Sequence, residues 1–149
     1  IRDSGLPAHW APNDLLFYTG NMFPDRYKNG AFIAFHGSTN RAPYPQAGYV
    51  IGFIPFKDGL PSGNLEIFAD GFANVEIIKD VKDAMYRPMG LAEGPDGSLY
   101  VSESKKGKIW RVIFDANKKE FGDKNLENME RRKYLPHIKT PTEFTDIVK

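Results

Sequence analysis

Short apolar runs separated by glycine and proline fill the first 114 residues of the chain. The runs are rich in β-branched and aromatic residues, and several alternate with polar positions, which is typical of β-strands. The first four predicted strands span residues 15–18, 31–36, 49–56 and 65–68. The turn Lys57-Asp58-Gly59 lies between the third and the fourth. The pattern therefore predicts one antiparallel unit of four strands in sequence order.

A second group of strands follows a less regular stretch at residues 73–86. Residues 89–92 are apolar, and Gly94-Pro95-Asp96-Gly97 has the composition of a tight turn, because proline presets φ at the second position. The strands 98–102 and 108–114 follow, separated by a lysine-rich turn. This second unit therefore has three predicted strands rather than four.

The chain changes character after residue 114. Residues 115–133 are polar and charged, with helix-forming residues from 125 to 133, where Leu126 and Met129 recur at helical spacing. Thr140 and Pro141 fit the cap and first position of a final helical turn. We expect residues 115–149 to form a tail with a short helix, and residues 1–114 to form the β part.

Successive four-stranded antiparallel units favour an all-β fold, a β-propeller fragment with a short helical C-terminal tail. A propeller blade is a four-stranded antiparallel sheet. At roughly 40–50 residues a blade, residues 1–114 supply about two to three blades. An incomplete ring exposes sheet edges. Three arrangements stay open: part of a larger ring, pairing with another copy through those edges, or a small independent sheet.

Composition and charge narrow the function classes. Hydrophobic residues make up 41% of the 149 residues, enough for a core. Twenty Lys and Arg oppose 19 Asp and Glu, a balance that predicts no nucleic-acid partner. The absence of cysteine excludes disulfides and thiolate metal sites within the chain. No apolar run approaches the length of a transmembrane helix.

The residues that could bind a metal or a phosphate do not form a known motif. Three histidines are scattered, no Asp-x-Asp-x-Asp-Gly calcium loop is present, and no glycine-rich phosphate loop occurs. No metal ligand or catalytic residue is predicted on these grounds.

The loop that follows the strand at 31–36 is the most site-like segment. His36, Asn40 and Arg41 lie within six residues of one another, and Gly37 permits close backbone approach. The alternative is a turn whose side chains cap its own backbone. Arg87 opens a later strand, and its planar guanidinium suits carboxylates. Its alternative role is an ion pair with Asp83 or another acid.

Four segments, residues 9–24, 29–49, 68–72 and 86–112, together resemble the glucose/sorbosone dehydrogenase family over roughly residues 5–114. The match is similar to the C-terminal part of an L-sorbosone dehydrogenase-like propeller. Residues 121–144 resemble the spacer that precedes a cytochrome c domain in some fused members.

This resemblance implies a six-bladed propeller that binds pyrroloquinoline quinone (PQQ) and oxidises a sugar or sugar aldehyde. It implies cofactor contacts at Arg87, Arg41, Asn40 and His36, calcium in the full-length parent, cytochrome c as a candidate electron acceptor, and a periplasmic or exported location.

This sequence also departs from the family pattern at several points. The family's general base lies on an early blade that this chain does not contain, so we expect residues 1–149 alone to be inactive. Met89 stands where the soluble glucose dehydrogenases have a second arginine, and the loop after the strand at 31–36 has no lysine. These departures favour the alternative, a non-catalytic propeller-type binding or scaffold module.

Overall fold

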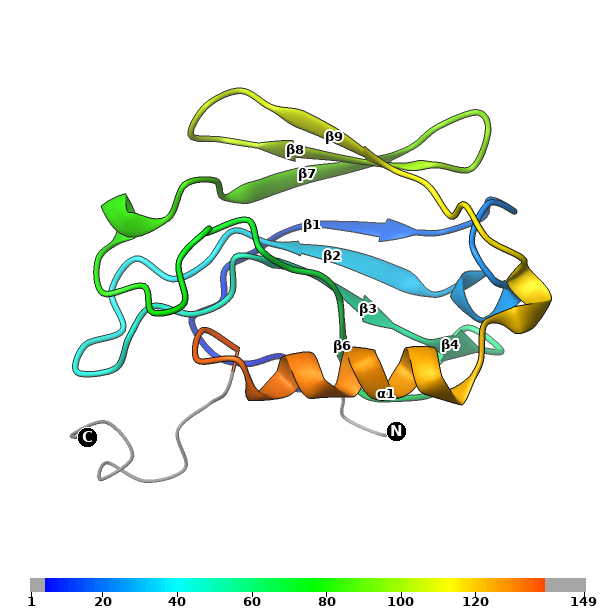
Figure 1. Cartoon of the computed structure of the whole chain (residues 1–149), viewed down its shortest axis with the longest axis horizontal. Helices are drawn as coiled ribbons and strands as arrows, with labels where there is room; N and C mark the ends of the chain where they lie inside the picture. The colour runs from blue at the N-terminus through cyan, green and yellow to red at the C-terminus, as the bar shows by residue number, and fades with distance from the viewer. Residues whose placement is uncertain (1–4, 139–149) are drawn as a thin grey trace.

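The first sheet contains four antiparallel strands in the order in which the chain supplies them. The structure is a computed structural model that describes residues 5–138. The strands are β1 (Pro12–Phe17), β2 (Ala31–Phe35), β3 (Val50–Ile54) and β6 (Glu66–Ala69), in the order β1-β2-β3-β6 (Figure 1). The prediction of one four-stranded unit is confirmed. All residues of β2 and β3 are buried, because both faces of these central strands are covered.

The predicted strand at residues 49–56 is two strands. β3 ends at Ile54, and the small hairpin of β4 (Phe56–Lys57) and β5 (Leu60–Pro61) begins after Pro55. Proline has no N–H to continue a ladder, which accounts for the break. Asp58 and Gly59 have φ of 53° and 78° and form the turn of this hairpin.

The second sheet has the three predicted strands, β7 (Pro88–Glu93), β8 (Leu99–Glu103) and β9 (Ile109–Val112). The tight turn before β8 is closed by a hydrogen bond from Gly97 N to Gly94 O of 2.9 Å. The connection from the first sheet includes a short 3-10 helix, η2 (Val81–Asp83). Further 3-10 helices are η1 (Asp25–Tyr27), η3 (Lys118–Glu120) and η4 (Arg132–Tyr134).

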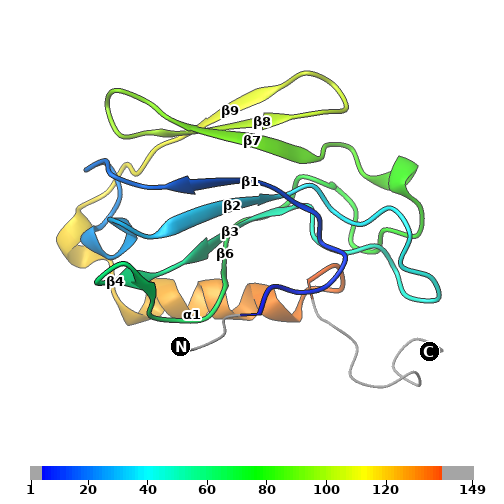
Figure 2. The same cartoon turned by 180° about the vertical axis from the view of Figure 1, so that it is seen from behind.

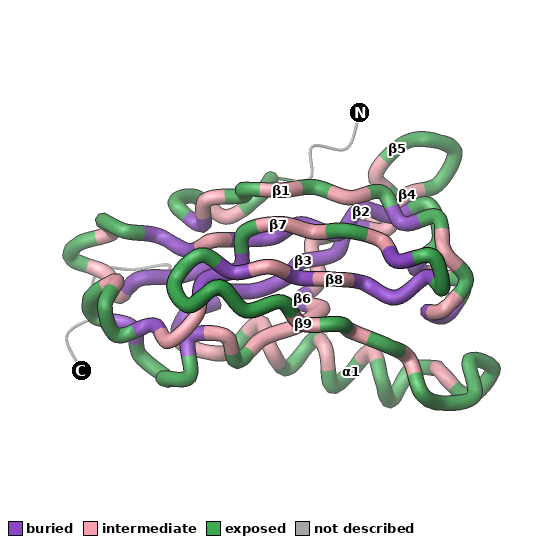
Figure 3. The backbone as a smooth tube through the Cα atoms, turned by 90° about the horizontal axis from the view of Figure 1, so that it is seen from above, coloured by how far each residue is buried: buried purple, intermediate pink, exposed green. Residues whose placement is uncertain are grey.

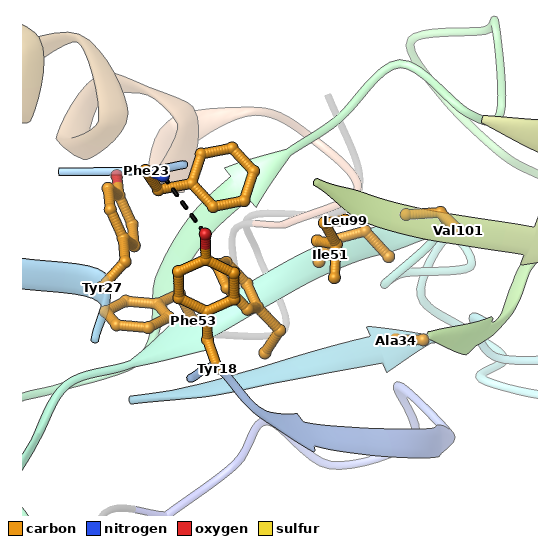
Figure 4. Packing of buried hydrophobic residues seen from close by; sticks show 9 residues of the cluster. Tyr18, Phe23, Tyr27, Ala34, Ile51, Phe53, Leu99 and Val101 are labelled. Atoms are coloured by element: carbon orange, nitrogen blue, oxygen red, sulfur yellow. Dashed lines mark hydrogen bonds between the residues drawn. The ribbon is translucent and has the colours of Figure 1, made fainter. Parts of the chain in front are cut away.

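An aromatic core joins the two sheets, whose edge strands β1 and β7 lie side by side without pairing. The buried cluster takes residues from both sheets and from the segment between β1 and β2: Tyr18, Phe23, Tyr27, Phe32, Ala34, Ile51, Phe53, Leu99 and Val101 (Figure 4). The Tyr18 hydroxyl donates to Gly97 O at 2.7 Å and accepts from Met22 N at 2.9 Å, so its polar atom is satisfied in the core. Asp14 Oδ2 accepts from Leu91 N at 2.7 Å and ties β1 to β7.

The tail packs against the outer strand of the first sheet. The helix α1 spans Asp123–Arg131 and lies along β6 (Figures 1 and 2). Arg132 Nη1 donates to Phe68 O at 2.6 Å, and His137 Nε2 lies 2.8 Å from Asp70 Oδ1. The predicted helix at 125–133 therefore exists, two residues earlier. The predicted final turn at 140–143 lies outside the described residues.

The antiparallel β character and the short C-terminal helix are thus confirmed. Figure 3 shows the buried central strands between more exposed edges. The sheets form no closed barrel within residues 5–138, and the six-bladed ring stays a prediction. No helix in this part of the chain has the length and apolar character needed to cross a membrane.

Candidate functional site

The site-like loop begins where β2 ends, at the end of the sheets where β7 begins and β8 ends. His36 N donates to Ala11 O and Gly37 N donates to Trp10 O, both at 2.9 Å. Gly37 has a φ of 89°, and a Cβ there would lie 2.4 Å from the Tyr49 ring. This position therefore admits only glycine without rearrangement.

The remainder of the loop is held by its own hydrogen bonds around Ser38. Ser38 Oγ donates to Gln46 Oε1 at 2.7 Å and accepts from Ala47 N at 2.9 Å. The Tyr49 hydroxyl donates to Ser38 O at 2.6 Å. The expected alternative, a turn that caps its own backbone, is therefore part of the observed structure.

Arg87 joins this loop to the second sheet. Its side chain is buried, with the residue 7% exposed. Arg87 Nε donates to His36 O at 3.0 Å and Nη2 donates to Gly37 O at 2.7 Å. The guanidinium carbon lies 5.5 Å from the centre of the Tyr49 ring. Arg87 therefore has backbone carbonyls as partners, and the alternative role, an ion pair with Asp83, is not observed.

Part of this guanidinium remains available. Arg87 Nη1 makes no hydrogen bond with any residue between 5 and 138, and it is not among the fully buried unpaired atoms there. Burial lowers the pKa of Arg87, against the effect of Tyr49, but arginine keeps its charge at neutral pH. A fixed cation whose Nη1 has no hydrogen-bond partner within residues 5–138 is suited to a carboxylate.

His36 lies beside Arg87 and reaches a residue that the sequence analysis did not single out. His36 Nε2 is 2.7 Å from the Ser104 hydroxyl oxygen. Ser104 follows β8, and its N–H donates to Arg87 O at 3.2 Å. The position directly after a strand that ends beside Arg87 is the signal that points to Ser104.

Asn40 and Arg41 lie farther along the same loop. Arg41 Nη1 donates to Pro45 O at 3.1 Å, and its guanidinium carbon lies 5.7 Å from the Tyr44 ring centre. Burial lowers the pKa of Arg41. Asn40 is exposed. The structure thus brings His36 and Arg87 into contact and places Asn40 and Arg41 on the same loop, without a contact to Arg87.

The donors of this loop fit an anionic cofactor better than a metal. Arginine, histidine, serine and asparagine side chains supply hydrogen-bond donors for carboxylate or carbonyl oxygens. Calcium requires several oxygen ligands. No group of three or more His, Asp or Glu residues that could hold a metal ion occurs within the described part of the chain.

The titration of His36 gives a first prediction. Burial, and then the charge of Arg87, lowers the pKa of His36 below the usual histidine value of about 6.5. The unfolded chain binds this proton more readily than the folded chain does. The contribution of neutral His36 to the free energy of unfolding is therefore present above pH 6.5 and is lost as the pH falls through the folded-state pKa of His36. We expect an NMR titration of the imidazole Hε1 to give a midpoint below 6.5, and the substitution His36→Gln to reduce the loss of stability in acid. A midpoint at or above 6.5 would contradict the environment described here.

Comparisons with known proteins identify a family other than the expected one. The family model described as TrAA12-like matches residues 4–114. An uncharacterized protein of Borreliella burgdorferi is 36% identical over 111 residues, which cover 74% of this chain and 27% of that protein. The expected membership of the glucose/sorbosone dehydrogenase family is wrong, because the matching family is TrAA12-like.

Two solved structures are also similar. They are the iodide and calcium structures of a Trichoderma reesei carbohydrate-active enzyme of family AA12, each 26% identical with a TM-score of 0.46. The similarity covers 68% of this chain and 24% of each of those chains. The chain therefore spans about a quarter of the length of the proteins that it matches.

Proposed function

The chain belongs to the TrAA12-like family, and on that premise we propose that it forms part of a PQQ-dependent oxidoreductase. The family supports the reaction class, an oxidoreductase of the PQQ type. A sugar or sugar aldehyde as substrate, cytochrome c as electron acceptor and an exported location stay predictions. PQQ, when bound, would supply the two-electron redox chemistry, while the protein binds and orients it.

The observation that carries the proposal is the Nη1 group of Arg87, which has no hydrogen-bond partner between residues 5 and 138. The two backbone carbonyls hold the guanidinium in one orientation, so a ligand that binds Nη1 meets a preorganised donor. PQQ carries three carboxylates and an ortho-quinone, which match such donors. Ser104 and His36 supply further polar atoms beside it. Arg41 and Asn40, on the same loop, are the residues that we propose for the outer part of the cofactor.

The test is a titration with PQQ, with and without calcium. Calorimetry and the quenching of tryptophan fluorescence measure the binding. It compares residues 1–149 with a longer polypeptide of the family that contains them. We expect Arg41→Ala to weaken binding about tenfold, the loss of one charge-assisted hydrogen bond. Lys57→Ala, in the β4–β5 hairpin, is the matched control and leaves the affinity unchanged.

A second candidate is a binding or scaffold module without catalysis. It is favoured by one observation: Nε and Nη2 of Arg87 are both used by the backbone. Absence of PQQ binding in both polypeptides, with folded protein in each, would overturn the oxidoreductase proposal and support this module. Binding that Arg41→Ala leaves unchanged would remove Arg41 from the cofactor site.

A further inference from the structure

A small cavity lies where the helix α1 meets the aromatic core. Its volume is about 320 Å³, which is in the range of sites for small molecules. Phe23 and Tyr27, both buried, form its deep wall, and Figure 4 shows these two rings on the side of the core next to the helix. Phe68 on β6 and Phe121 before α1 add two further rings. The walls of the cavity are therefore mainly aromatic.

The polar side chains of this cavity lie on one face of the helical segment. Asn125, Asn128 and Arg132, which begins η4, follow one another at spacings of three and four residues, so they share a face. Met129 lies on that face as well, and its sulfur accepts a hydrogen bond from the Tyr27 hydroxyl at 3.4 Å. The face of a helix that packs against a core is ordinarily apolar. Three polar side chains instead line a cavity that is otherwise apolar.

The orientation of the Arg132 guanidinium leaves its side-on pair of donors directed away from the backbone. Nη1 donates to Phe68 O at 2.6 Å, which fixes the guanidinium against β6. Nε and Nη2 make no hydrogen bond with any residue between 5 and 138. These two nitrogens carry the parallel N–H groups that a carboxylate accepts in a bidentate pair. In Arg87 the same two nitrogens donate to backbone carbonyls.

The charge of Arg132 has no counter-charge in the lining of this cavity. No carboxylate is among the lining residues in the described part of the chain. The cavity beside Trp110, by contrast, has both Asp70 and Arg111 in its lining. A fixed cation between aromatic walls favours a ligand that combines a negative charge with an apolar body.

We propose that this cavity binds a small carboxylic acid with an aromatic body. The carboxylate would pair with Nε and Nη2 of Arg132. Asn125 Oδ1 accepts from Gly122 N at 3.0 Å, which leaves the amide nitrogen of Asn125 as a further donor. The ring of the ligand would contact Phe23 and Phe68, whose own rings meet edge-on at 5.5 Å between centroids.

This site is separate from the loop that we propose for the cofactor. The family model matches residues 4–114, so α1 and Arg132 lie outside the matched part of the chain. The cavity therefore combines the core of the matched part with a segment that follows it. Its ligand can bind whether or not the loop at His36 holds PQQ.

An NMR titration of the isotope-labelled chain with phenylacetate tests the proposal. We expect saturable shifts of the amides of α1 and of residues 23–27, with a Kd on the order of 1 mM for a ligand of this size. Phenylacetamide, which has the same shape without the charge, is the matched ligand. We expect it to bind at least about tenfold more weakly, because it cannot form the charge-assisted pair. Equal affinity for the two ligands would overturn the proposal.

Variants of the helical segment assign the contact. Arg132→Met keeps the apolar stem and is expected to weaken phenylacetate binding about tenfold, while Arg131→Met, a neighbouring arginine outside the cavity lining, leaves it unchanged. Asn128→Trp fills the cavity from an exposed position and is expected to abolish binding without altering Arg132. Binding that survives both Arg132→Met and Asn128→Trp would contradict this site.

The location of the shifts separates this site from the cofactor loop. Shifts at His36 and Arg87, with none in α1, would place the carboxylate in that loop and overturn the present proposal. Loss of phenylacetate binding in a longer polypeptide of the family would also overturn it, because the cavity would then be closed in that protein. Failure of PQQ to bind, with phenylacetate binding retained, would affect only the proposed function.

Discussion

Replacing Arg87 by methionine is expected to lower the free energy of unfolding by about 3 kcal/mol. The substitution keeps an apolar stem of similar length but removes both donors to the carbonyls of His36 and Gly37. Those oxygens would lose charge-assisted partners at a buried position. Urea denaturation followed by circular dichroism measures the change through the transition midpoint.

Arg111→Met is the matched control for this prediction. Arg111 also has side-chain partners, an ion pair with Asp96 and a hydrogen bond from Nε to Ser98 Oγ at 3.2 Å, but its side chain is 50% exposed. An exposed pair of this kind is screened by solvent and contributes little to stability, so we expect a much smaller effect than for Arg87→Met. If the two substitutions lowered the stability equally, the guanidinium of Arg87 would have no special part in holding the loop.

The second large effect is expected in the aromatic core. We expect Phe32→Ala to lower the free energy of unfolding by about 4 kcal/mol. Phe32 is fully buried in β2, and the substitution leaves a cavity that the neighbouring rings fill only in part. Its ring centroid lies between 4.7 and 6.0 Å from those of Phe68, Phe53, Tyr18, Tyr27 and Phe23. Thermal or urea unfolding monitored by near-ultraviolet circular dichroism reports both the loss of stability and the altered ring packing.

Phe17→Ala tests whether burial, rather than loss of an aromatic ring as such, sets this effect. Phe17 contacts Phe56 edge-on at 5.0 Å between centroids, but the residue is 51% exposed. We expect Phe17→Ala to lower the free energy of unfolding by only about 1 kcal/mol. A cost similar to that of Phe32→Ala would show that the core described here does not dominate the stability.

The strand pattern was predictable because the core is built from local apolar runs. The run at 31–36 is apolar at successive positions, and β2 is buried on both faces as that pattern requires. The Gly94-Pro95-Asp96-Gly97 turn forms as predicted, because its proline and glycine residues favour the backbone angles of a tight turn. The extra hairpin of β4 and β5 was not predicted, because its strands of two residues are too short to show an alternating pattern.

The contact between His36 and Arg87 joins two residues that the sequence analysis singled out, but their partners differ from those expected. His36 and Arg87 were both singled out, yet the sequence suggested carboxylates as the partners of Arg87. Its partners are backbone carbonyls, which carry no residue-type signal. Ser104 and His36 are 68 positions apart in the sequence, and they meet only because the two sheets pack together.

The contacts between the sheets also bear on the order in which the chain can fold. The hydrogen bonds from Arg87 to His36, Leu91 to Asp14 and Tyr18 to Gly97 join residues separated by 51, 77 and 79 positions. Each requires a long loop to close before its stabilisation is gained, which slows folding relative to proteins with local contacts. Because the aromatic cluster draws on both sheets, neither sheet retains a complete core when the other unfolds. The two sheets are therefore expected to melt as one cooperative unit, despite their separate hydrogen-bond ladders.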